Sequence, residues 1–282
     1  MKIGVIGLGL IGASLARGWV KSGREVLGWD LDPEVMSAGK DLAAYTEVLT
    51  KQNAKELDML VVALTPQATV NVWKEWAPYL RKGTVVCDIA GTKRYVVEQA
   101  ALLAEQYPHL YWICTHPMAG REYSGIKHSQ VGLFDKSTLL VVPVAAPKEV
   151  VKATVKLFLE LGFGKSVYTT APEHDRIIAF TSQLAHIVSN AYILSETATE
   201  QRGFSAGSFR DMTRVARINA PMWSELFVEN RDHLVPQIDE LIAHLTNMRD
   251  AIQLGDRATI EQYLKKGNAR KILVDRQNRG KD

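Results

Sequence analysis

The chain has 282 residues, which is too long for one comfortable hydrophobic core and fits two domains. Hydrophobic residues make up 46% and charged residues 23%, which is typical of a soluble globular protein and excludes a disordered one. The net charge of +3 predicts no nucleic-acid partner, and the basic run from Lys265 to Lys281 is interpreted as a solvated helix end. No apolar stretch reaches membrane-spanning length, and no signal peptide is evident. Cys87 and Cys114 lie in apolar runs typical of reduced thiols, so we expect a cytoplasmic protein.

Short β-rich runs alternate with helical patterns through the first part of the chain. A helix is predicted to begin with Thr65 as N-cap and Pro66 as its first residue, and another is predicted after Pro147. Strands are predicted at Lys2–Ile6, Glu25–Asp30, Met59–Leu64, Thr84–Ile89, Leu110–Cys114, Thr138–Pro143 and Ser166–Tyr168. This alternation predicts an α/β Rossmann domain at residues 1–168, with a doubly wound and mostly parallel sheet.

After Pro172 the strand signals vanish and apolar residues fall at helical spacing. The longest such series is Leu234, Ile238, Leu241, Ile242, Leu245 and Met248. We therefore expect an all-α domain at residues 169–282. Several of its helices are apolar on more than one face, which a small domain cannot bury alone. A homodimer formed through this domain is the economical solution.

The first predicted strand runs directly into the segment Gly7-Leu8-Gly9-Leu10-Ile11-Gly12, which has the G-x-G-x-x-G pattern. Gly7 permits the tight turn, Gly9 lets the backbone approach a pyrophosphate, and Gly12 lets helix and strand pack closely. The N-terminus of the following helix offers free N–H groups to an anion. A strand before the segment and a helix after it predict a dinucleotide site.

The second predicted strand ends in Asp30, 18 residues after Gly12. A carboxylate at this point accepts hydrogen bonds from ribose hydroxyls and repels a 2′-phosphate. Leu31 follows, so no arginine is placed to hold that phosphate, and NAD is favoured over NADP. Asp32 is interpreted as a cap or turn residue before Pro33, and Thr65 is included among the predicted cofactor contacts.

Two side chains outside this loop suit chemistry on a hydroxyl-bearing anion. His116 lies at the carboxyl end of a predicted strand, where open α/β sheets place their ligands, and its pKa suits it to accept a hydroxyl proton. Arg214 can clamp a carboxylate through two charge-assisted hydrogen bonds. The alternative for His116 is a packed loop histidine without a catalytic role. The alternative for Arg214 is an ion pair with Asp211 on the helix surface.

Four segments, together with the glycine loop, resemble the prephenate/arogenate dehydrogenase family over nearly the whole chain. They are Asp88-Ile89-Ala90-Gly91-Thr92-Lys93, His116-Pro117-Met118-Ala119-Gly120-Arg121-Glu122, Thr181-Ser182-Gln183-Leu184-Ala185-His186 and Phe209-Arg210-Asp211-Met212-Thr213-Arg214-Val215-Ala216. The resemblance implies a Rossmann domain, a helical dimerisation domain and a hydride-transferring decarboxylase. It implies neither an added regulatory or mutase domain nor a metal site.

The resemblance also implies roles for individual residues. His116 matches the acceptor of the ring 4-hydroxyl proton, and Arg214 matches the residue on a substrate carboxylate. His186 is implied to face the substrate, with a buried helix histidine as the alternative, and Glu122 and Trp223 match pocket positions. Asp175, Asp211 and Lys93 are implied to form a supporting network. On an uninterrupted helix, the 11-residue spacing would put Asp175 and His186 on one face.

This sequence departs from the family pattern at Gly91, where the family has a serine that bonds the reacting hydroxyl. Thr92, or the backbone N–H of Gly91, is the expected substitute. A carboxylate close to His116, such as Glu122, is expected to raise its pKa.

The sequence as a whole therefore predicts an NAD-dependent prephenate dehydrogenase. Arogenate as substrate, possibly with NADP, is the first alternative. A dehydrogenase of β-hydroxyacids or imines is a more distant one. A non-catalytic NAD-binding sensor represents a different class, and the combination of His116 with Arg214 argues against it.

Overall fold

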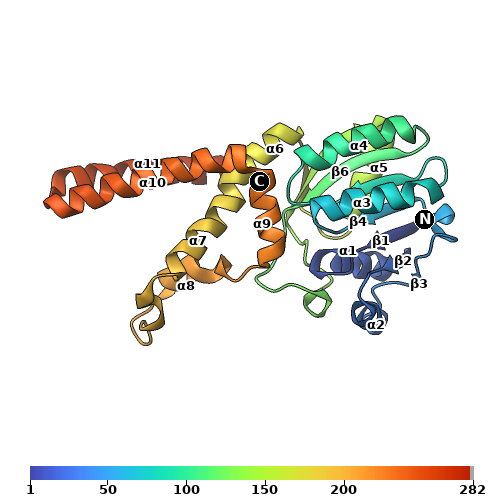
Figure 1. Cartoon of the computed structure of the whole chain (residues 1–282), viewed down its shortest axis with the longest axis horizontal. Helices are drawn as coiled ribbons and strands as arrows, with labels where there is room; N and C mark the ends of the chain where they lie inside the picture. The colour runs from blue at the N-terminus through green and yellow to red at the C-terminus, as the bar shows by residue number, and fades with distance from the viewer. Residues whose placement is uncertain (280–282) are drawn as a thin grey trace. The chain divides into compact units, whose positions relative to one another are not determined.

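The computed structural model describes residues 1–279, shown in Figure 1. Lys281, at the end of the predicted basic run, lies outside the described residues. The chain forms two compact units, which divide between Arg231 and Asp232. The first unit contains the sheet and a group of helices, and the second is a pair of long helices.

One sheet of eight strands, counted over the described residues, forms the centre of the first unit in the order β3-β2-β1-β4-β5-β6-β7-β8. Neighbouring strands are parallel except for β6 and β7, which are antiparallel. The strands are β1 (Lys2–Ile6), β2 (Glu25–Trp29), β3 (Glu47–Val48), β4 (Met59–Val62), β5 (Val85–Asp88), β6 (Tyr111–Pro117), β7 (Thr138–Ala145) and β8 (Lys165–Tyr168).

The central strands are apolar on both faces because helices cover both sides of the sheet. In β4, Met59 and Val61 pack into one buried cluster with side chains of α1, α2 and α5, while Leu60 and Val62 pack into a second cluster with α3 and α4. The helices over the sheet are α1 (Leu10–Lys21), α2 (Pro33–Asp41), α3 (Pro66–Trp76), α4 (Arg94–Gln106) and α5 (Lys148–Leu159). This two-sided covering confirms the predicted Rossmann fold.

The remainder of the first unit is helical. It begins with α6 (Ala171–Ile178), whose first turn is capped by the Thr170 hydroxyl accepting from the Glu173 N–H. A π-helical segment, Ala179–Leu184, separates α6 from α7. The further helices are α7 (Ala185–Ile193), α8 (Gly207–Thr213) and α9 (Ala220–Glu229), and Arg214–Ala216 forms a single 3₁₀ turn after α8.

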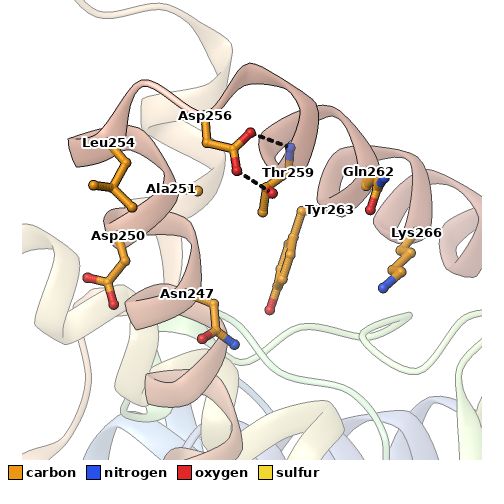
Figure 2. Close-up of a pocket in the computed structure, with 9 residues that line it drawn as sticks. All are labelled: Asn247, Asp250, Ala251, Leu254, Asp256, Thr259, Gln262, Tyr263 and Lys266. Atoms are coloured by element: carbon orange, nitrogen blue, oxygen red, sulfur yellow. Dashed lines mark hydrogen bonds between the residues drawn. The ribbon is translucent and has the colours of Figure 1, made fainter.

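The second unit is a hairpin of α10 (Arg231–Leu254) and α11 (Arg257–Arg279). Gly255 adopts a φ of +66° and ends α10, a position where a residue without a Cβ is favoured. The Asp256 carboxylate caps α11 by accepting from the Thr259 N–H at 3.0 Å and the Thr259 hydroxyl at 2.6 Å. A cavity of about 400 Å³ lies beside this turn and is lined by Asn247, Tyr263 and Lys266 among others (Figure 2). It contains none of the predicted site residues.

The largest differences between the structure and the predicted elements concern two strands. The two-residue edge strand β3 was not predicted, because Glu47–Val48 is too short to show a pattern. Strand β6 continues to Pro117 instead of ending at Cys114, so His116 lies within the strand and pairs with Leu140 of β7. Helix α3 begins at Thr65 and Pro66 as predicted. None of the helices within residues 1–279 is both long and apolar enough to span a membrane.

Candidate active site

The glycine loop after β1 has a geometry that only glycine allows at two of its three positions. Gly7 has a φ of +90°, and a Cβ there would lie 2.5 Å from the Ala63 carbonyl oxygen. A Cβ on Gly12 would lie 1.9 Å from the Gly7 carbonyl oxygen, so α1 packs directly onto the loop. Gly9, the N-cap of α1, has open space where its Cβ would be. The loop therefore fits a pyrophosphate at Gly9, beside the helix N-terminus.

Asp30 follows β2 and is tied to the same loop. Its carboxylate accepts from the backbone N–H of Leu8 at 2.7 Å and from that of Asp32 at 3.0 Å. Leu31 is 84% exposed, and Asp32 caps α2 by accepting from the Glu34 N–H. Thr65 stands at the N-cap of α3, beyond the end of β4. The carboxyl edge of the sheet thus presents an acid and two helix N-termini around the glycine loop.

A buried ion pair holds together the ends of β5 and β6. The Lys93 ammonium pairs with the Asp88 carboxylate and also donates to the carbonyls of Ala90, at 2.8 Å, and Thr92, at 3.3 Å. Asp88 accepts in turn from the N–H of Thr115 at 3.1 Å. All the protons of Lys93 are used inside the protein, so this lysine fixes the loop after β5 and the strand position immediately before His116.

His116 is partly buried, and its ring contacts a second histidine. Its Nδ1 lies 2.9 Å from Nε2 of His174, a residue of α6 that is 2% exposed. Burial lowers the pKa of His116 well below its usual range, and the neighbouring His174 and Lys93 lower it further. The expectation that Glu122 would raise this pKa was wrong, because Glu122 pairs elsewhere and the neighbours of His116 penalise its charged form.

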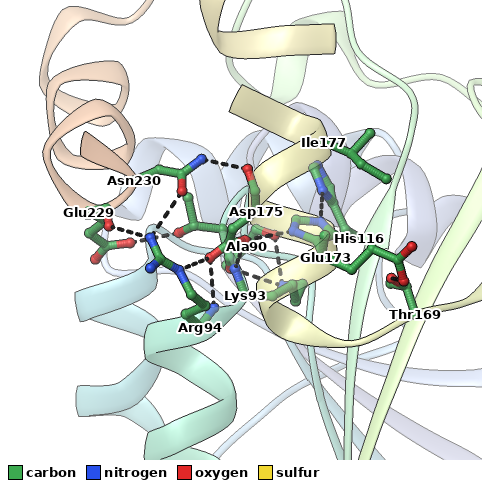
Figure 3. Close-up of polar contacts among 12 residues, drawn as sticks. Ala90, Lys93, Arg94, His116, Thr169, Glu173, Asp175, Ile177, Glu229 and Asn230 are labelled. Carbon is green, nitrogen blue, oxygen red and sulfur yellow. Dashed lines mark hydrogen bonds and ion pairs between the residues drawn. The ribbon is translucent and has the colours of Figure 1, made fainter. Parts of the chain in front are cut away.

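Asp175, next to His174 in α6, connects the sheet edge to the helices of the first unit (Figure 3). Its carboxylate accepts from the backbone N–H groups of Lys93 and Arg94, at 2.7 and 2.9 Å, and from Arg94 Nε at 3.2 Å. Burial raises the pKa of Asp175, but the hydrogen bonds from His174, Arg94 and Lys93 outweigh it and bring the pKa below its ordinary value. Asn230 completes the connection, donating to the Asp175 carbonyl at 2.8 Å and to the Gln183 side chain at 2.7 Å.

The space beside Gly91 is limited by Leu226 of α9. A Cβ there would lie 3.1 Å from Leu226 Cδ1 of α9, so a side chain at this position requires Leu226 to move. The neighbouring Thr92 is buried, and its hydroxyl donates to Glu229 Oε2 at 2.6 Å. Burial raises the pKa of Glu229, and the Thr92 hydrogen bond opposes that rise. The hydroxyl expected to replace the serine therefore bonds a carboxyl group of α9.

Arg214, on the turn after α8, lies in a more exposed setting. Its side chain is 61% exposed and pairs with Glu122 at 3.1 Å. Within the described residues, Arg214 therefore pairs with Glu122 and not with Asp211, the partner suggested by helical spacing. The backbone N–H of Glu122 and the Arg214 guanidinium lower the pKa of the Glu122 carboxyl, so both members of the pair are charged.

His186 and Trp223 lie beside Arg214. Their ring centroids are 3.8 Å apart, and His186 Nδ1 donates to the Val215 carbonyl at 2.9 Å. Burial lowers the pKa of His186, the Val215 carbonyl opposes this, and Arg214 adds to it. The π-helical segment Ala179–Leu184 lies between Asp175 and His186. The same-face spacing expected of an uninterrupted α-helix therefore does not apply to these two residues.

The structure thus brings the predicted residues together in two groups. The buried network contains Asp88, Lys93, His116, His174 and Asp175, and the Arg214 cluster contains Arg214, Glu122, His186 and Trp223. No role for His174 or Asp88 was predicted from the sequence. The adjacent His174-Asp175 pair at the start of a predicted helix was the available signal. In the part of the chain that the structure describes, no group of three or more His, Cys, Asp or Glu side chains is placed to hold a metal ion.

Two family models together match most of the chain, from residue 15 to residue 266. Residues 15–168 match the nucleotide-binding domain of prephenate dehydrogenase, and residues 170–266 match its dimerization domain. Among curated proteins, the cyclohexadienyl dehydrogenase of Zymomonas mobilis is 28% identical, with 96% of this chain and 95% of that protein covered. The prephenate dehydrogenase of Lactococcus lactis is also 28% identical, with 94% of this chain and 75% of that protein covered.

Solved structures show the same fold. A prephenate dehydrogenase of Aquifex aeolicus, in complex with hydroxyphenyl propionate and NAD+, superimposes with a TM-score of 0.84 at 21% identity, covering 97% of this chain and 98% of that one. The arogenate dehydrogenase of Synechocystis superimposes with a TM-score of 0.79 at 23% identity, covering 97% and 100%. The chain belongs to the prephenate dehydrogenase family of NAD(P)-dependent oxidoreductases.

Proposed function

We propose that this protein catalyses the NAD-dependent oxidative decarboxylation of prephenate to 4-hydroxyphenylpyruvate, with His116 as the proton acceptor. The observation that carries the proposal is the placement of His116 in β6, with one ring nitrogen engaged by His174 and its pKa lowered by burial. Such an imidazole is neutral at pH 7 and able to take a proton. Arogenate is the second candidate, because relatives of both names match the chain.

In the proposed reaction, four side chains of the protein bind the substrate or move its proton. Arg214 holds a substrate carboxylate in place of its present partner Glu122, while His186 and Trp223 form a wall of the pocket. His116 accepts the proton of the ring hydroxyl as hydride leaves the same carbon. Bound NAD supplies the hydride acceptor. Loss of the ring carboxylate as CO2 makes the ring aromatic, so the protein contributes mainly orientation and one base.

The preference for NAD rests on the glycine loop and Asp30. Gly9 leaves room for a pyrophosphate, and the Asp30 carboxylate, bonded to the same loop, would accept hydrogen bonds from the hydroxyls of the adenosine ribose. Its charge would repel a 2′-phosphate, and the exposed Leu31 offers no cation to bind one.

A homodimer formed through residues 169–282, with 1–168 as the cofactor domain, is part of the proposal. The dimerization-domain match supports it. So do exposed apolar side chains within each unit, including Leu194 and Phe204 in the first and Leu245 and Leu254 in the second. The free and buried thiols of Cys87 and Cys114 support a reducing compartment, which we take to be the cytoplasm.

A two-by-two assay of prephenate and arogenate against NAD and NADP tests the function directly. We expect the highest kcat/KM with prephenate and NAD. The double substitution Asp30→Ser with Leu31→Arg is expected to move the cofactor preference toward NADP. Faster turnover of wild type with NADP would contradict the ribose assignment, and turnover of arogenate alone would establish the second candidate.

A further inference from the structure

Three side chains in the buried network form a continuous hydrogen-bonded chain that ends at His116. Asp175 Oδ1 lies 2.7 Å from His174 Nδ1, and His174 Nε2 lies 2.9 Å from His116 Nδ1. Asp175 and His174 are adjacent in α6, whereas His116 is in β6, 58 residues earlier. These two hydrogen bonds therefore link the position of helix α6 to the ring of the proposed base, His116.

The first member of this chain is held as a hydrogen-bond acceptor. The Asp175 carboxylate accepts hydrogen bonds from the backbone N–H groups of Lys93 and Arg94 and from Arg94 Nε, at distances between 2.7 and 3.2 Å. These donors lie at the N-terminus of α4, where the helix dipole also favours a negative charge. Asp175 is consequently a carboxylate with no proton to donate.

The fixed carboxylate determines the direction of both hydrogen bonds. An acceptor at Asp175 Oδ1 requires the proton of a neutral His174 to be on Nδ1, because two lone pairs facing each other at 2.7 Å would repel. His174 Nε2 then carries a lone pair and accepts from His116 Nδ1. His116 must therefore carry its proton on Nδ1 and a lone pair on Nε2, the nitrogen that does not face His174.

We propose, building on the function proposed above, that His174 is a positioning residue that selects the tautomer of His116 in which Nε2 accepts the substrate proton. In the step itself, the hydroxyl O–H bond breaks and an Nε2–H bond forms, while the hydride passes to the nicotinamide. His116 becomes an imidazolium whose Nδ1–H continues to donate to His174 Nε2. Asp175 remains ionised throughout, so its part is to orient the two rings and not to receive the proton.

Burial, together with the nearby Lys93 ammonium, keeps the pair of histidines neutral before reaction. Burial lowers the pKa of His174, the hydrogen bond that His174 donates to Asp175 opposes this, and Lys93 lowers the pKa further. Asp88 faces it from the end of β5 and favours its charged form, while His116 lies against it in β6. Glu173 and Tyr168 line, with His174, a cavity of about 170 Å³ between β8 and α6. Protonation of His174 would reverse the hydrogen bond, put a proton on His116 Nε2 and stop the reaction.

Two substitutions of His174 separate this role from simple packing. In His174→Gln the side-chain carbonyl can still accept from His116 Nδ1, whereas His174→Phe keeps the ring and removes the acceptor. We expect His174→Phe to lower kcat by about 10²-fold, with little change in KM, and His174→Gln to recover a large part of the loss. His109→Phe, a ring replacement beside Tyr107 and outside the network, is the matched control and should leave kcat unchanged. A His174→Phe variant as active as His174→Gln would overturn the proposal.

The tautomer can also be measured without any turnover. In protein labelled with ¹⁵N-histidine, the seven histidines give separate ring signals, and His116→Gln identifies those of His116. The proposal requires a protonated Nδ1 and an unprotonated Nε2 on His116 in wild type at pH 7.5, and a mixture of tautomers in His174→Phe. The same His116 tautomer in both proteins would overturn it. Lack of turnover with either substrate, combined with the expected tautomers, would instead refute the proposed function alone.

Discussion

The buried network and the Arg214 cluster contain similar residue types but differ in burial and in the number of partners that hold each charge. In the network, Lys93 and Asp88 have fully buried side chains, and the hydrogen bonds cross between β5, β6, α4 and α6. In the cluster, Arg214 is 61% exposed and has one carboxylate partner from the loop after β6. A charge in the first group cannot lose its partner without a large cost, whereas the second group can exchange a partner for a ligand.

This difference assigns the two groups to different kinetic parameters. A rigid, dry arrangement holds the base in one tautomer and orientation, so changes there should appear mainly in kcat. An exposed cation with a replaceable partner provides binding, so changes there should appear mainly in KM. Substitutions in the two groups should therefore change different kinetic parameters.

The largest effect is expected at the base itself. His116→Asn retains some hydrogen-bonding capacity but cannot take a proton at neutral pH. We expect kcat to fall by about 10²- to 10⁴-fold, with the affinity for NAD nearly unchanged. Steady-state kinetics and a cofactor titration followed by tryptophan fluorescence measure the two quantities. A variant with near-normal kcat would remove His116 from the reaction.

The next effect is expected at Asp175, the fixed acceptor of the network. Asp175→Asn places an amide where the N–H groups of Lys93 and Arg94 and the ring of His174 all need an acceptor. We expect kcat to fall by about 10²-fold and the free energy of unfolding to fall by roughly 2–3 kcal/mol. Denaturant unfolding and kinetics on the same samples check both. Reduced stability with unchanged kcat would show that Asp175 has only a structural role.

In the Arg214 cluster a smaller change is expected, and it should appear in the KM for prephenate instead of kcat. Arg214→Ala should raise the KM for prephenate by about 10- to 10²-fold, since a charge-assisted hydrogen bond is lost at a partly exposed site. The KM for NAD and the stability should hardly change. Arg210→Ala, a nearby substitution in α8, serves as control. A normal KM for prephenate would leave Arg214 as a surface ion pair.

The smallest change is expected at Glu122. This carboxylate forms an ion pair with Arg214 and would repel an anionic substrate. Because exposed pairs contribute at most about 1 kcal/mol, Glu122→Gln should lower the KM for prephenate by no more than about fivefold. A rise in KM would mean that Glu122 itself holds the substrate.

The parts of the fold set by local pattern were predictable from the sequence. The apolar run predicted as the strand Met59–Leu64 and the Thr65-Pro66 helix start are local signals, and the structure has a strand at Met59–Val62 and a helix that begins at Pro66. The end of β6 was not predictable, because Thr115 and His116 are held in the strand by pairing with β7 more than 20 residues later. The π-helical segment Ala179–Leu184 was equally hidden, since apolar spacing over six residues does not separate it from an α-helix.

The candidate site was predictable where a residue type alone suggests chemistry, as for the glycine loop, Asp30 and Arg214. The residues that were missed act through contacts distant in sequence. His174 acquires its importance only from His116 across 58 residues, and Asn230 reaches Asp175 across 55. The expected influence of Glu122 on His116 failed for the same reason, because its partner Arg214 comes from 92 residues away.

The pH dependence of kcat/KM for prephenate tests most directly whether His116 is the base. His116 must be neutral to accept the proton, and its pKa is lowered, so activity should be full at pH 7 and fall only as the pH drops below about 6.5. His186→Asn should keep this acid limb, while His116→Asn should lose it along with most of the activity. A limb above pH 7 in wild type, or one that persists in His116→Asn and disappears in His186→Asn, would contradict the assignment of His116 as the base.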